Sequence, residues 1–420
     1  MMNVIAASKQ NGFPNLIVQK YGGSSVATSE KICGVARKVK ARVETGAKVA
    51  VVVSAMGKTT DSMIALARKV SPSSEPPPRE MDMLLATGEQ VSAALLSMAL
   101  NDLKVPAISR NAFQLGIVTS GNYSNARIRD INLTLLSRDM ERYDVVVITG
   151  FQGITPEGDF TTLGRGGSDT SAVAIAAKAG APCEIYSDVP GIFTCDPHKV
   201  PGAHKLEAIT YTEMLELASL GAKVLHMRAV ELARRYEVNL YCASTFSEER
   251  GTSVLKELPE WMETPVVTGV TVARNQVRFV VKNIPGNGDI VSGIFQTLAL
   301  AGANIDMISM AGDRGLSFLT FTVLDCDEKS VLKAVTDYMN SHNLTGWTLE
   351  PGVPVAKVSA VGDGMNTATG VAGRLFSALR SRSISIMGIS TSDINISVLV
   401  DGTRADEAVE ALAEEFALKS

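Results

Sequence analysis

The hydrophobic positions of residues 1–246 fall into short apolar runs that alternate with stretches of helical spacing. The apolar runs predict strands at 16–19, 49–54, 105–109, 145–149, 184–187 and 239–243. Several runs are continuous valine and isoleucine segments, which is typical of strands buried on both faces. The helical stretches lie between them, at 81–100, 169–179, 211–220 and 228–236. The alternation predicts an α/β fold, with a mostly parallel sheet covered by helices on both faces.

The pattern changes after residue 246. Residues 247–264 are polar and are followed by Pro265, which suits a linker. Beyond it, residues 294–309 align without gaps on residues 375–390, and each copy runs from a helix into two short strands. A repeat of this kind indicates a duplicated small α/β module, of the sort that binds regulators or mediates assembly.

Composition limits the possible functions. The chain has 420 residues, 45% hydrophobic and 20% charged, which describes a globular protein of about two to four domains. A net charge of −4 argues against nucleic acid as a partner, and the sequence lacks both a basic run and a long uninterrupted apolar segment, so we expect no membrane contact. Five scattered cysteines without a C-x-x-C pair predict free thiols in a reducing, cytoplasmic setting.

Two glycine-rich loops carry the candidate chemistry. In residues 161–172, Gly164, Gly166 and Gly167 allow close approach of the backbone to a ligand, and Arg165 stands between them at the predicted start of a helix. Such a loop suits an anion, with Ser168 and Asp169 as N-cap residues.

The second loop follows the first predicted strand. Lys20 supplies a point charge there, beside the free backbone N–H groups of Gly22 and Gly23. The tripeptide 57–59, Gly-Lys-Thr, is not the end of a Walker A loop, because Val52 occupies the position of the required first glycine. A phosphate group is therefore expected at the first strand.

Four motifs occur in the order found in one enzyme family. They are Lys20-Tyr21-Gly22-Gly23-Ser24-Ser25-Val26, the Gly-Arg-Gly-Gly-Ser-Asp loop at 164–169, the segment 187–193 followed by Asp196-Pro197, and 389–392 with 396–399. With them, the chain resembles the monofunctional aspartokinases of the amino-acid kinase superfamily, from residue 16 to about residue 416. The resemblance implies an amino-acid-kinase domain at 1–246, a linker at 247–264 and two ACT domains of the βαββαβ type. The first, at 275–345, would be inserted in the second, made of 265–274 and 346–420.

The family's reaction is the ATP-dependent phosphorylation of the L-aspartate side chain to 4-phospho-L-aspartate, with Mg²⁺. This is the first step of lysine, threonine and methionine biosynthesis. A carboxylate with a pKa near 4 is already ionised at neutral pH, so the acceptor needs no general base. The enzyme must instead position two anions and screen their charge.

The resemblance also implies roles for individual residues. Lys20 and Asp169 would be catalytic, and no side chain is expected to bind a metal. The ATP-binding set would be Lys20, Tyr21, Gly22, Gly23, Ser54, Ser187, Asp188, Phe193, His198 and Lys223. The aspartate-binding set would be Thr60, Glu89, Arg165, Gly166, Gly167, Ser168 and Asp169.

Feedback regulation by lysine, threonine or both is expected at the ACT domains, which would pair across a homodimer and could build a tetramer. The effector-binding set would be Asn283, Ile284, Gly288, Asp289, Ile290, Asn304, Asp306, Thr369, Gly370 and Val371. Four positions depart from the family's pattern: His198, often Arg; Asn283, often Asp; Met310, often Gln; and Thr369, often Pro.

Two alternatives remain open at this point. One is a kinase for another acidic amino acid, such as glutamate or N-acetylglutamate, which the predicted partners of a free ammonium and α-carboxylate disfavour. The other is a catalytically silent amino-acid sensor, which the presence of Lys20, Glu89, Arg165 and Asp169 disfavours.

Overall fold

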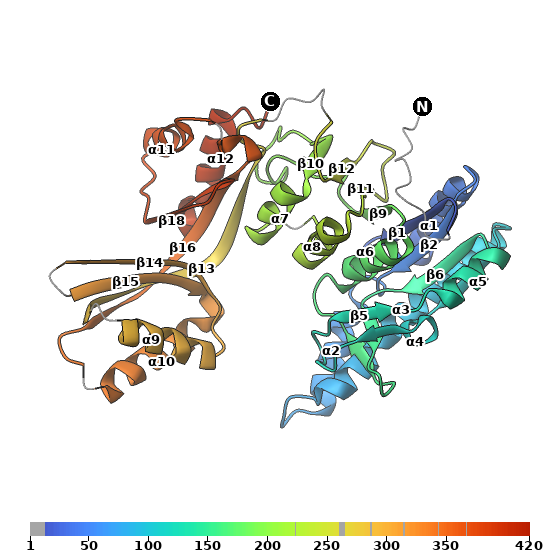
Figure 1. Ribbon diagram of the computed structural model, residues 1–420, viewed down its shortest axis with the longest axis horizontal. Helices are drawn as coiled ribbons and strands as arrows, with labels where there is room; N and C mark the ends of the chain where they lie inside the picture. Colours follow the sequence, from blue (N-terminus) through green and yellow to red (C-terminus); the bar gives the residue numbers. More distant parts are fainter. Residues whose placement is uncertain are drawn as a thin grey trace. The chain divides into compact units, whose positions relative to one another are not determined.

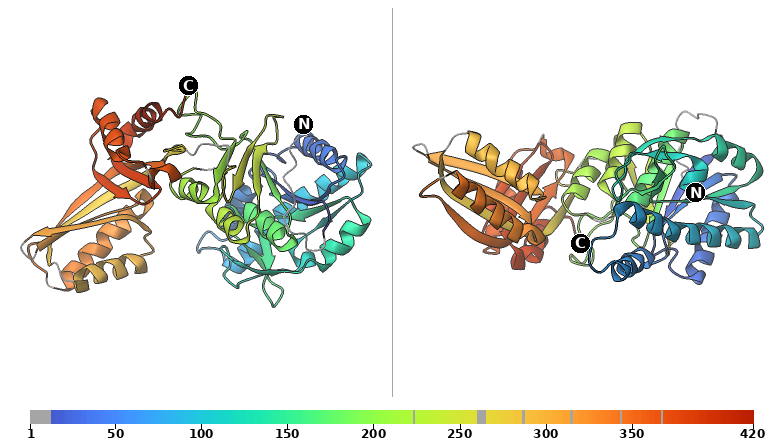
Figure 2. Two further views of the ribbon diagram at one scale, coloured as in Figure 1. Left: turned by 45° about the horizontal axis from the view of Figure 1, so that its top comes forward. Right: turned by 90° about the horizontal axis from the view of Figure 1, so that it is seen from below.

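The chain forms two compact units (Figures 1 and 2). The computed structural model describes residues 13–222, 224–259, 265–285, 288–313, 316–342, 344–366 and 368–420. The first unit holds Met1–Phe193, Lys205–Ser219 and Lys223–Glu263, and the second holds Thr194–His204, Leu220–Ala222 and Thr264–Ser420.

An eight-stranded sheet forms the centre of the first unit, in the order β10-β12-β11-β9-β1-β2-β6-β3. Its strands are β1 (Leu16–Tyr21), β2 (Lys48–Val53), β3 (Ala107–Arg110), β6 (Val145–Thr149), β9 (Cys183–Ser187), β10 (Ala208–Thr210), β11 (Leu240–Ser244) and β12 (Thr252–Leu255). Every neighbouring pair is parallel except β11 and β12. The predicted parallel sheet is confirmed, and each of the six predicted strands is present with its ends shifted by a residue or two.

Helices cover both faces of this sheet. The helices are α1 (Ser29–Val43), α2 (Thr59–Val70), α3 (Pro78–Asp102), α4 (Ala112–Leu115), α5 (Thr134–Arg142), α6 (Gly167–Ala179), α7 (Tyr211–Ser219) and α8 (Met227–Tyr236). Apolar residues of α1 and α3 share one core with odd-numbered positions of β1 and β2. Helix α6 packs against β1 and β2 from the opposite face, where Lys20 meets its first turn. The glycine loops therefore meet where the parallel strands end, at their carboxyl edge.

Helix α3 is long and apolar enough to cross a membrane by length and composition alone. Half of its most apolar window is buried inside the unit, where Leu96 and Leu100 join the core against β2 and β6. This packing as a core helix of the first unit explains its apolar character.

A small second sheet lies beside α3 and was not predicted. It consists of β4 (Ile117–Thr119), β5 (Ile128–Ile131), β7 (Gln152–Ile154) and β8 (Phe160–Thr162), in the order β5-β4-β7-β8. Each strand has only three or four residues, too few to leave an apolar pattern in the sequence.

The segment predicted as a linker contains a strand of the main sheet, and the prediction of a pure linker at 247–264 is wrong. Strand β12 pairs with β11, and Thr252 and Val254 are fully buried. The preceding Gly251 lies so close to β11 that a Cβ there would stand 2.1 Å from the Cys242 carbonyl oxygen. The segment's polar composition concealed a strand that lies inside the sheet, between β10 and β11.

The second unit is built on one antiparallel sheet, in the order β14-β15-β13-β16-β18-β17. Its elements are β13 (Gly269–Pro285), α9 (Gly288–Leu300), β14 (Ile305–Asp313), β15 (Leu316–Leu324), α10 (Glu328–Ser341), β16 (Thr348–Val361), α11 (Val371–Ser381), β17 (Gly388–Thr391), β18 (Asn395–Asp401) and α12 (Ala405–Glu415). Helices α9 and α10 pack on one core and α11 and α12 on another.

Two long strands join these halves. Residues 269–273 of β13 pair with 357–361 of β16, and residues 276–282 pair with 348–355. The start of β13 therefore completes the half formed by the end of the chain, and the rest of β13 belongs to the other half.

Candidate active site

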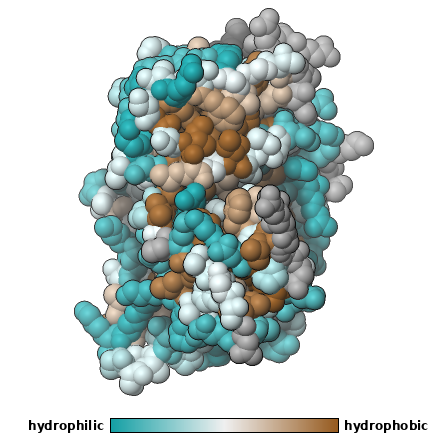
Figure 3. All heavy atoms as spheres, turned by 90° about the vertical axis from the view of Figure 1, so that its left-hand side faces the viewer, coloured by the Kyte–Doolittle hydropathy of each residue, from teal (hydrophilic) through white to brown (hydrophobic). Residues whose placement is uncertain are grey.

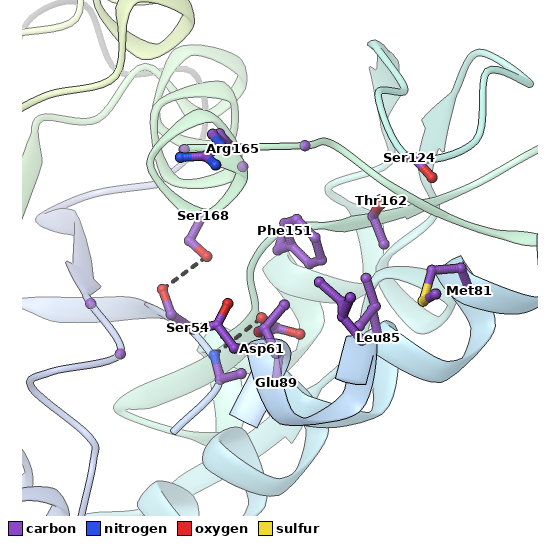
Figure 4. A pocket seen from close by; sticks show the side chains of 18 of the residues that line it. Ser54, Asp61, Met81, Leu85, Glu89, Ser124, Phe151, Thr162, Arg165 and Ser168 are labelled. Carbon is purple, nitrogen blue, oxygen red and sulfur yellow. Dashed lines mark hydrogen bonds between the residues drawn. The ribbon is translucent and has the colours of Figure 1, made fainter. Parts of the chain in front are cut away.

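A cavity of about 840 Å³ opens in the first unit where β1 and β2 end (Figure 4). Its wall is formed by the turns after these strands, by α2 and α3, and by the loop that leads into α6. The predicted site residues that it brings together are Lys20, Gly22, Gly23, Ser54, Thr60, Glu89, Arg165, Gly166, Gly167, Ser168 and Asp169. Residues far apart in the sequence thus share one cavity, as the glycine loops predicted.

An ion pair stands where β1 ends, at the place where the sequence predicts a phosphate. The Lys20 Nζ lies 2.6 Å from Oδ1 of Asp169, and both side chains are 12% exposed. Lys20 comes from the end of β1 and Asp169 from the first turn of α6, so the pair fixes the strand to the helix. A mobile cation held beside a helix N-terminus is suited to an incoming anion.

Gly23 allows the turns after β1 and β2 to touch. A Cβ at this position would lie 2.8 Å from the Ala55 carbonyl oxygen and 3.3 Å from that of Gly57. The Gly57 N–H donates a 3.0 Å hydrogen bond to the Gly23 carbonyl. A larger residue at position 23 would push the two turns apart and change the cavity wall that they form.

Glu89 presents an unpaired oxygen at the wall of the cavity. Its Oε1 accepts a 3.1 Å hydrogen bond from the Ala55 N–H, while the buried Oε2 has no hydrogen-bond partner among the described residues. Burial raises the pKa of this carboxyl to about 7. The group is therefore placed to receive a cationic or N–H donor.

The loop before α6 carries Arg165, the arginine among the predicted substrate-binding residues. Gly164 and Gly166 have φ angles of 76° and 66°, a region that favours glycine, and Arg165 between them is exposed. A Cβ at Gly166 would lie 2.1 Å from the His226 ring, so the loop also needs glycine for space. Arg165 has no hydrogen-bond or ion-pair partner among the described residues, which leaves its guanidinium available to an anion (Figure 4).

The predicted N-caps of α6 are wrong. The N-cap is Gly166, and Ser168 and Asp169 lie in the first turn of the helix. The Ser168 Oγ accepts a 2.9 Å hydrogen bond from the Ser54 Oγ, and Asp169 pairs with Lys20. Both side chains therefore contact residues of neighbouring elements. They are free to do so because the turn before the helix is formed by glycines and does not need a capping side chain.

Residues predicted for the nucleoside lie at the neighbouring strand ends, outside the wall of this cavity. Ser187 ends β9, one residue beyond the Tyr186 carbonyl that accepts from the Gly22 N–H at 3.3 Å. Asp188 after it is exposed, and Phe193 is half-buried. Ser187 is thus adjacent to the glycine turn along the edge of the sheet.

Two of the other three predicted nucleotide contacts do not line this cavity. The Tyr21 side chain is fully buried and stacks on Tyr186 with ring centroids 4.9 Å apart, so it belongs to the core. His198 is exposed in the second unit, where its N–H donates to Asp196. Lys223 lies outside the described residues.

The cavity also contains residues that the sequence did not indicate. Phe151 follows β6 with a φ of 69°, unusual for a bulky residue, and forms a wall opposite Glu89 (Figure 4). Its position just after the end of a buried parallel strand is the sequence feature that could have indicated a residue of the site. The others are Asp61, Ile64 and Arg68 of α2, Glu75 and Pro76, Pro78, Met81 and Leu85 of α3, and Ser124 and Thr162. The proline-rich segment 71–79 thus contributes to the wall.

The residues predicted to bind an effector divide into two groups. Ile284, Ile290 and Val371 are buried in the two cores of the second unit, so their side chains face away from solvent. The exposed ones are Asn283, Gly288, Asp289, Asn304, Asp306, Thr369 and Gly370. Of these, Asp306 already pairs with Lys357, and Asn283 donates to the Gly346 carbonyl at 3.3 Å.

Metal ligands are not clustered in the described ranges, which contain no group of three or more His, Cys, Asp or Glu placed for a metal ion. All five cysteines are free thiols, as predicted, and Cys183, Cys195 and Cys242 are buried.

Comparisons with known proteins agree with the two units. Residues 15–244 match the amino acid kinase family, and residues 358–416 match an ACT domain. The chain is 44% identical over 405 residues to an aspartokinase of Bacillus sp. (strain MGA3), covering 96% of this chain and 97% of that protein. It is 43% identical over 404 residues to aspartokinase 2 of Bacillus subtilis (strain 168), covering 96% and 98%.

Solved structures show the same architecture. The aspartate kinase of Synechocystis matches with 41% identity and a TM-score of 0.53, covering 96% of this chain and 69% of that one. The fold is also that of E. coli aspartokinase III in complex with aspartate and ADP, with a TM-score of 0.78 and 24% identity over 96% of this chain and all of that one. The chain belongs to the amino acid kinase family and, within it, to the aspartokinases.

Proposed function

We propose that the cavity transfers the γ-phosphoryl group of ATP to the side-chain carboxylate of L-aspartate, with Lys20, Glu89, Arg165 and Asp169 as its principal groups. The observation that carries the proposal is the wall itself, which sets an unpaired guanidinium and an unpaired carboxylate oxygen in the same cavity as a lysine at a glycine turn. These are the complements of an α-carboxylate, an ammonium and a phosphate.

The aspartate side follows from the charges. Arg165 can form a bidentate pair with the α-carboxylate, for which its planar fork is suited. The free Oε2 of Glu89 can accept a hydrogen bond from the ammonium, and Asp169 adds a second negative charge. Thr60, in the first turn of α2, supplies a hydroxyl at the same wall. An N-acetylated substrate lacks the ammonium and would offer Glu89 a single neutral N–H in place of a cation.

The phosphate side uses cations and backbone groups. Lys20 exchanges Asp169 for a phosphoryl oxygen, while Gly22 and Gly23 offer backbone N–H groups and the N-terminus of α6 adds its dipole. Ser187 and Asp188 extend the same edge toward the nucleoside. Positioning and screening of charge are what phosphoryl transfer requires, because the acceptor carboxylate is already a nucleophile.

Mg²⁺ fits this donor set as an ion carried by the nucleotide. It keeps several waters and takes one or two carboxylates in addition to phosphates, and no larger acidic cluster is present among the described residues. When bound, it neutralises charge on the phosphates.

Regulation by lysine or threonine through the second unit is the remaining part of the proposal. That unit carries the ACT match and seven exposed candidate residues. Its strands also expose large apolar side chains, among them Ile308, Met310, Leu316, Phe318 and Ile389, and Figure 3 shows hydrophobic surface on the face of this unit turned to the viewer. Exposed apolar patches of this kind support pairing with a second copy.

The test is to trap the acyl phosphate with hydroxylamine in the presence of Mg-ATP and either L-aspartate or L-glutamate. Aspartyl hydroxamate should form and should fall by about 100-fold or more in Lys20→Ala, as for loss of one group that stabilises developing charge. Lys48→Ala, at the amino end of β2, is the matched control and should retain activity. Product from glutamate alone would contradict the proposal.

Lysine and threonine are added to the same assay, singly and together. An effector should change aspartate affinity by about 5- to 150-fold, the usual range of allosteric coupling. Identical kinetics with saturating amounts of either amino acid and of both would reject this part of the proposal.

A further inference from the structure

Two segments of chain that form one wall of the cavity lie side by side. The Ala126 N–H donates a 2.9 Å hydrogen bond to the Thr162 carbonyl, which joins residues 124–126 to the loop that carries Arg165. Ser124 and Thr162 both line the cavity (Figure 4). Because Gly164 and Gly166 flank Arg165, the loop's own residues restrict its backbone little.

A buried carboxylate holds both segments from the side of α3. Asp82 is 0% exposed and accepts 2.8 Å hydrogen bonds from the N–H groups of Ser124 and Thr162 and from the Thr162 hydroxyl. The Ser124 hydroxyl is a fourth donor, at 3.4 Å. All four donors are neutral, so the carboxylate's charge serves to orient these two peptide groups.

A guanidinium holds the same segments from the side of α8. Arg228 donates to the Leu163 carbonyl at 2.5 Å and to the Ala126 carbonyl at 3.0 Å. These acceptors are one and two residues from the N–H groups that bind Asp82. Burial, and then the neighbouring Arg127, lower the pKa of Arg228, because both disfavour its charged form.

We propose that Asp82 and Arg228 are positioning residues for the aspartate site, acting as a charged clamp on the loop that presents Arg165. Asp82 binds the N–H groups and Arg228 the carbonyl groups of the same two segments, so the clamp fixes the direction of their peptide planes. The clamp thereby restricts the backbone of the loop, which Gly164 and Gly166 alone would leave free to change conformation. The inference rests on the proposed function, in which Arg165 binds the α-carboxylate.

A purely structural role would have different consequences. It would lower folded protein and affect both substrates alike, whereas the clamp acts on aspartate through Arg165 alone. The two roles are separated by kinetics for aspartate and ATP, and by a double-mutant cycle with Arg165.

The deciding variant is Arg228→Lys, which keeps the charge and the apolar stem but loses the fork. We expect kcat/KM for aspartate to fall about tenfold, the effect of losing one hydrogen bond to a charged group, with KM for ATP changed by less than about twofold. In an Arg165→Ala background the same change should alter kcat/KM for aspartate by less than about twofold. Arg234→Lys, at an exposed position on the same helix, is the matched control.

A second test uses Asp82→Asn, with Asp102→Asn at the exposed end of α3 as its control. The amide at position 82 should reproduce the aspartate-selective loss, because it cannot accept hydrogen bonds from all four donors. Arg228→Lys distinguishes the two roles whether or not Asp82→Asn folds. Unchanged kinetics, equal losses for ATP and aspartate, or a full tenfold loss in the Arg165→Ala background would each overturn the clamp. A wild-type protein that forms no aspartyl hydroxamate would instead overturn the proposed function.

Discussion

Glu89 shows how one side chain's surroundings set its chemistry. The carboxyl is 3% exposed, accepts a single N–H, and leaves its second oxygen without a partner in the described part of the chain. In this environment the neutral acid is favoured until a cation arrives, which is why its pKa is raised to about 7. An ammonium group would reverse the preference, because it stabilises the charged form.

The first prediction concerns the pH dependence of catalysis. Below pH 7 the free enzyme carries protonated Glu89, which does not attract an ammonium, so kcat/KM for aspartate should fall as the pH drops below about 7. Glu89→Gln should be less active at pH 8 and should lose this dependence. Initial-rate measurements between about pH 6 and 8.5 test it, with KM for ATP as the internal control. A profile that is identical in the variant would rule out Glu89 as the titrating group.

The same pKa predicts a change in stability. The unfolded carboxyl titrates near pH 4.3 and the folded one near 7, so the folded state binds more protons between these values. The contribution of Glu89 to stability is therefore fully present below about pH 4.3 and is lost as the pH rises through 7. Glu89→Gln should be more stable than the wild type at pH 8, by about 1–3 kcal/mol, and the difference should shrink at pH 5.

Thermal unfolding at the two pH values measures this effect. The exposed Glu80→Gln, on the same helix, should show no such pH-dependent gain. A Glu89→Gln protein that is less stable than the wild type at both pH values would contradict the expected burial of the charge.

At the scale of elements, a buried charge joins α1 to the sheet. Glu184 of β9 accepts 2.7 Å hydrogen bonds from Arg42 and from Gln19, and a 3.1 Å bond from the Tyr186 hydroxyl. The Glu184 and Arg42 side chains are 8% and 15% exposed. The three donors come from α1, β1 and β9, so one carboxylate connects three elements beneath the active edge of the sheet.

The prediction for this network is that Glu184→Gln lowers the free energy of unfolding by about 3 kcal/mol, because it leaves the Arg42 charge without its partner. Asp130→Asn is the control, since it breaks an equally short ion pair with Lys178 whose side chains are 64% and 50% exposed. Little change is expected there, because exposed pairs are screened by water. Urea unfolding of both variants measures the contrast, and equal losses would refute it.

Elements with long apolar runs were predictable, and elements defined by their neighbours were not. Strand β2 is indicated by its consecutive valines. Strands β4 and β7 have three residues each and depend on pairing with each other and with β5 and β8. Strand β12 was hidden in a polar segment, because its pairing with β11 and not its composition makes it a strand.

The site divides in the same way. Arg165 lies in a glycine loop, and Lys20 and Asp169 lie next to the two glycine loops, which are visible in the sequence. Glu89 and Thr60 were inferred only through resemblance to a family. Asp82 and Arg228 reach the wall by way of α3 and α8, through contacts between residues far apart in the chain, for which the sequence carries no local signal.

At the scale of the whole molecule, the second unit should unfold as one body. Strands β13 and β16 have 17 and 14 residues and run through both halves of its sheet. Neither half can lose its central strands without disturbing the other.

A core substitution in one half tests this. Phe279→Ala removes a fully buried ring from β13, at a cost of about 3–5 kcal/mol. Hydrogen exchange should then accelerate in β18 of the other half as well as in β15, because the opening is shared. Phe318→Ala, on β15 but half exposed, is the control and should leave β18 protected. Faster exchange confined to β13–β15 would show two independent halves.

The shared strands also constrain how this protein can be recombined with its relatives. A chimera that exchanges only the inner ACT repeat must cut β13 and β16 in the middle, and the new halves must match in twist and in the register shifts between Ala273 and Gln276. A grafted effector site would thus bring with it a mismatched junction in β13 and β16. A crossover placed before β13 transfers the whole sheet intact. We therefore expect the two repeats to be exchanged together in recombination.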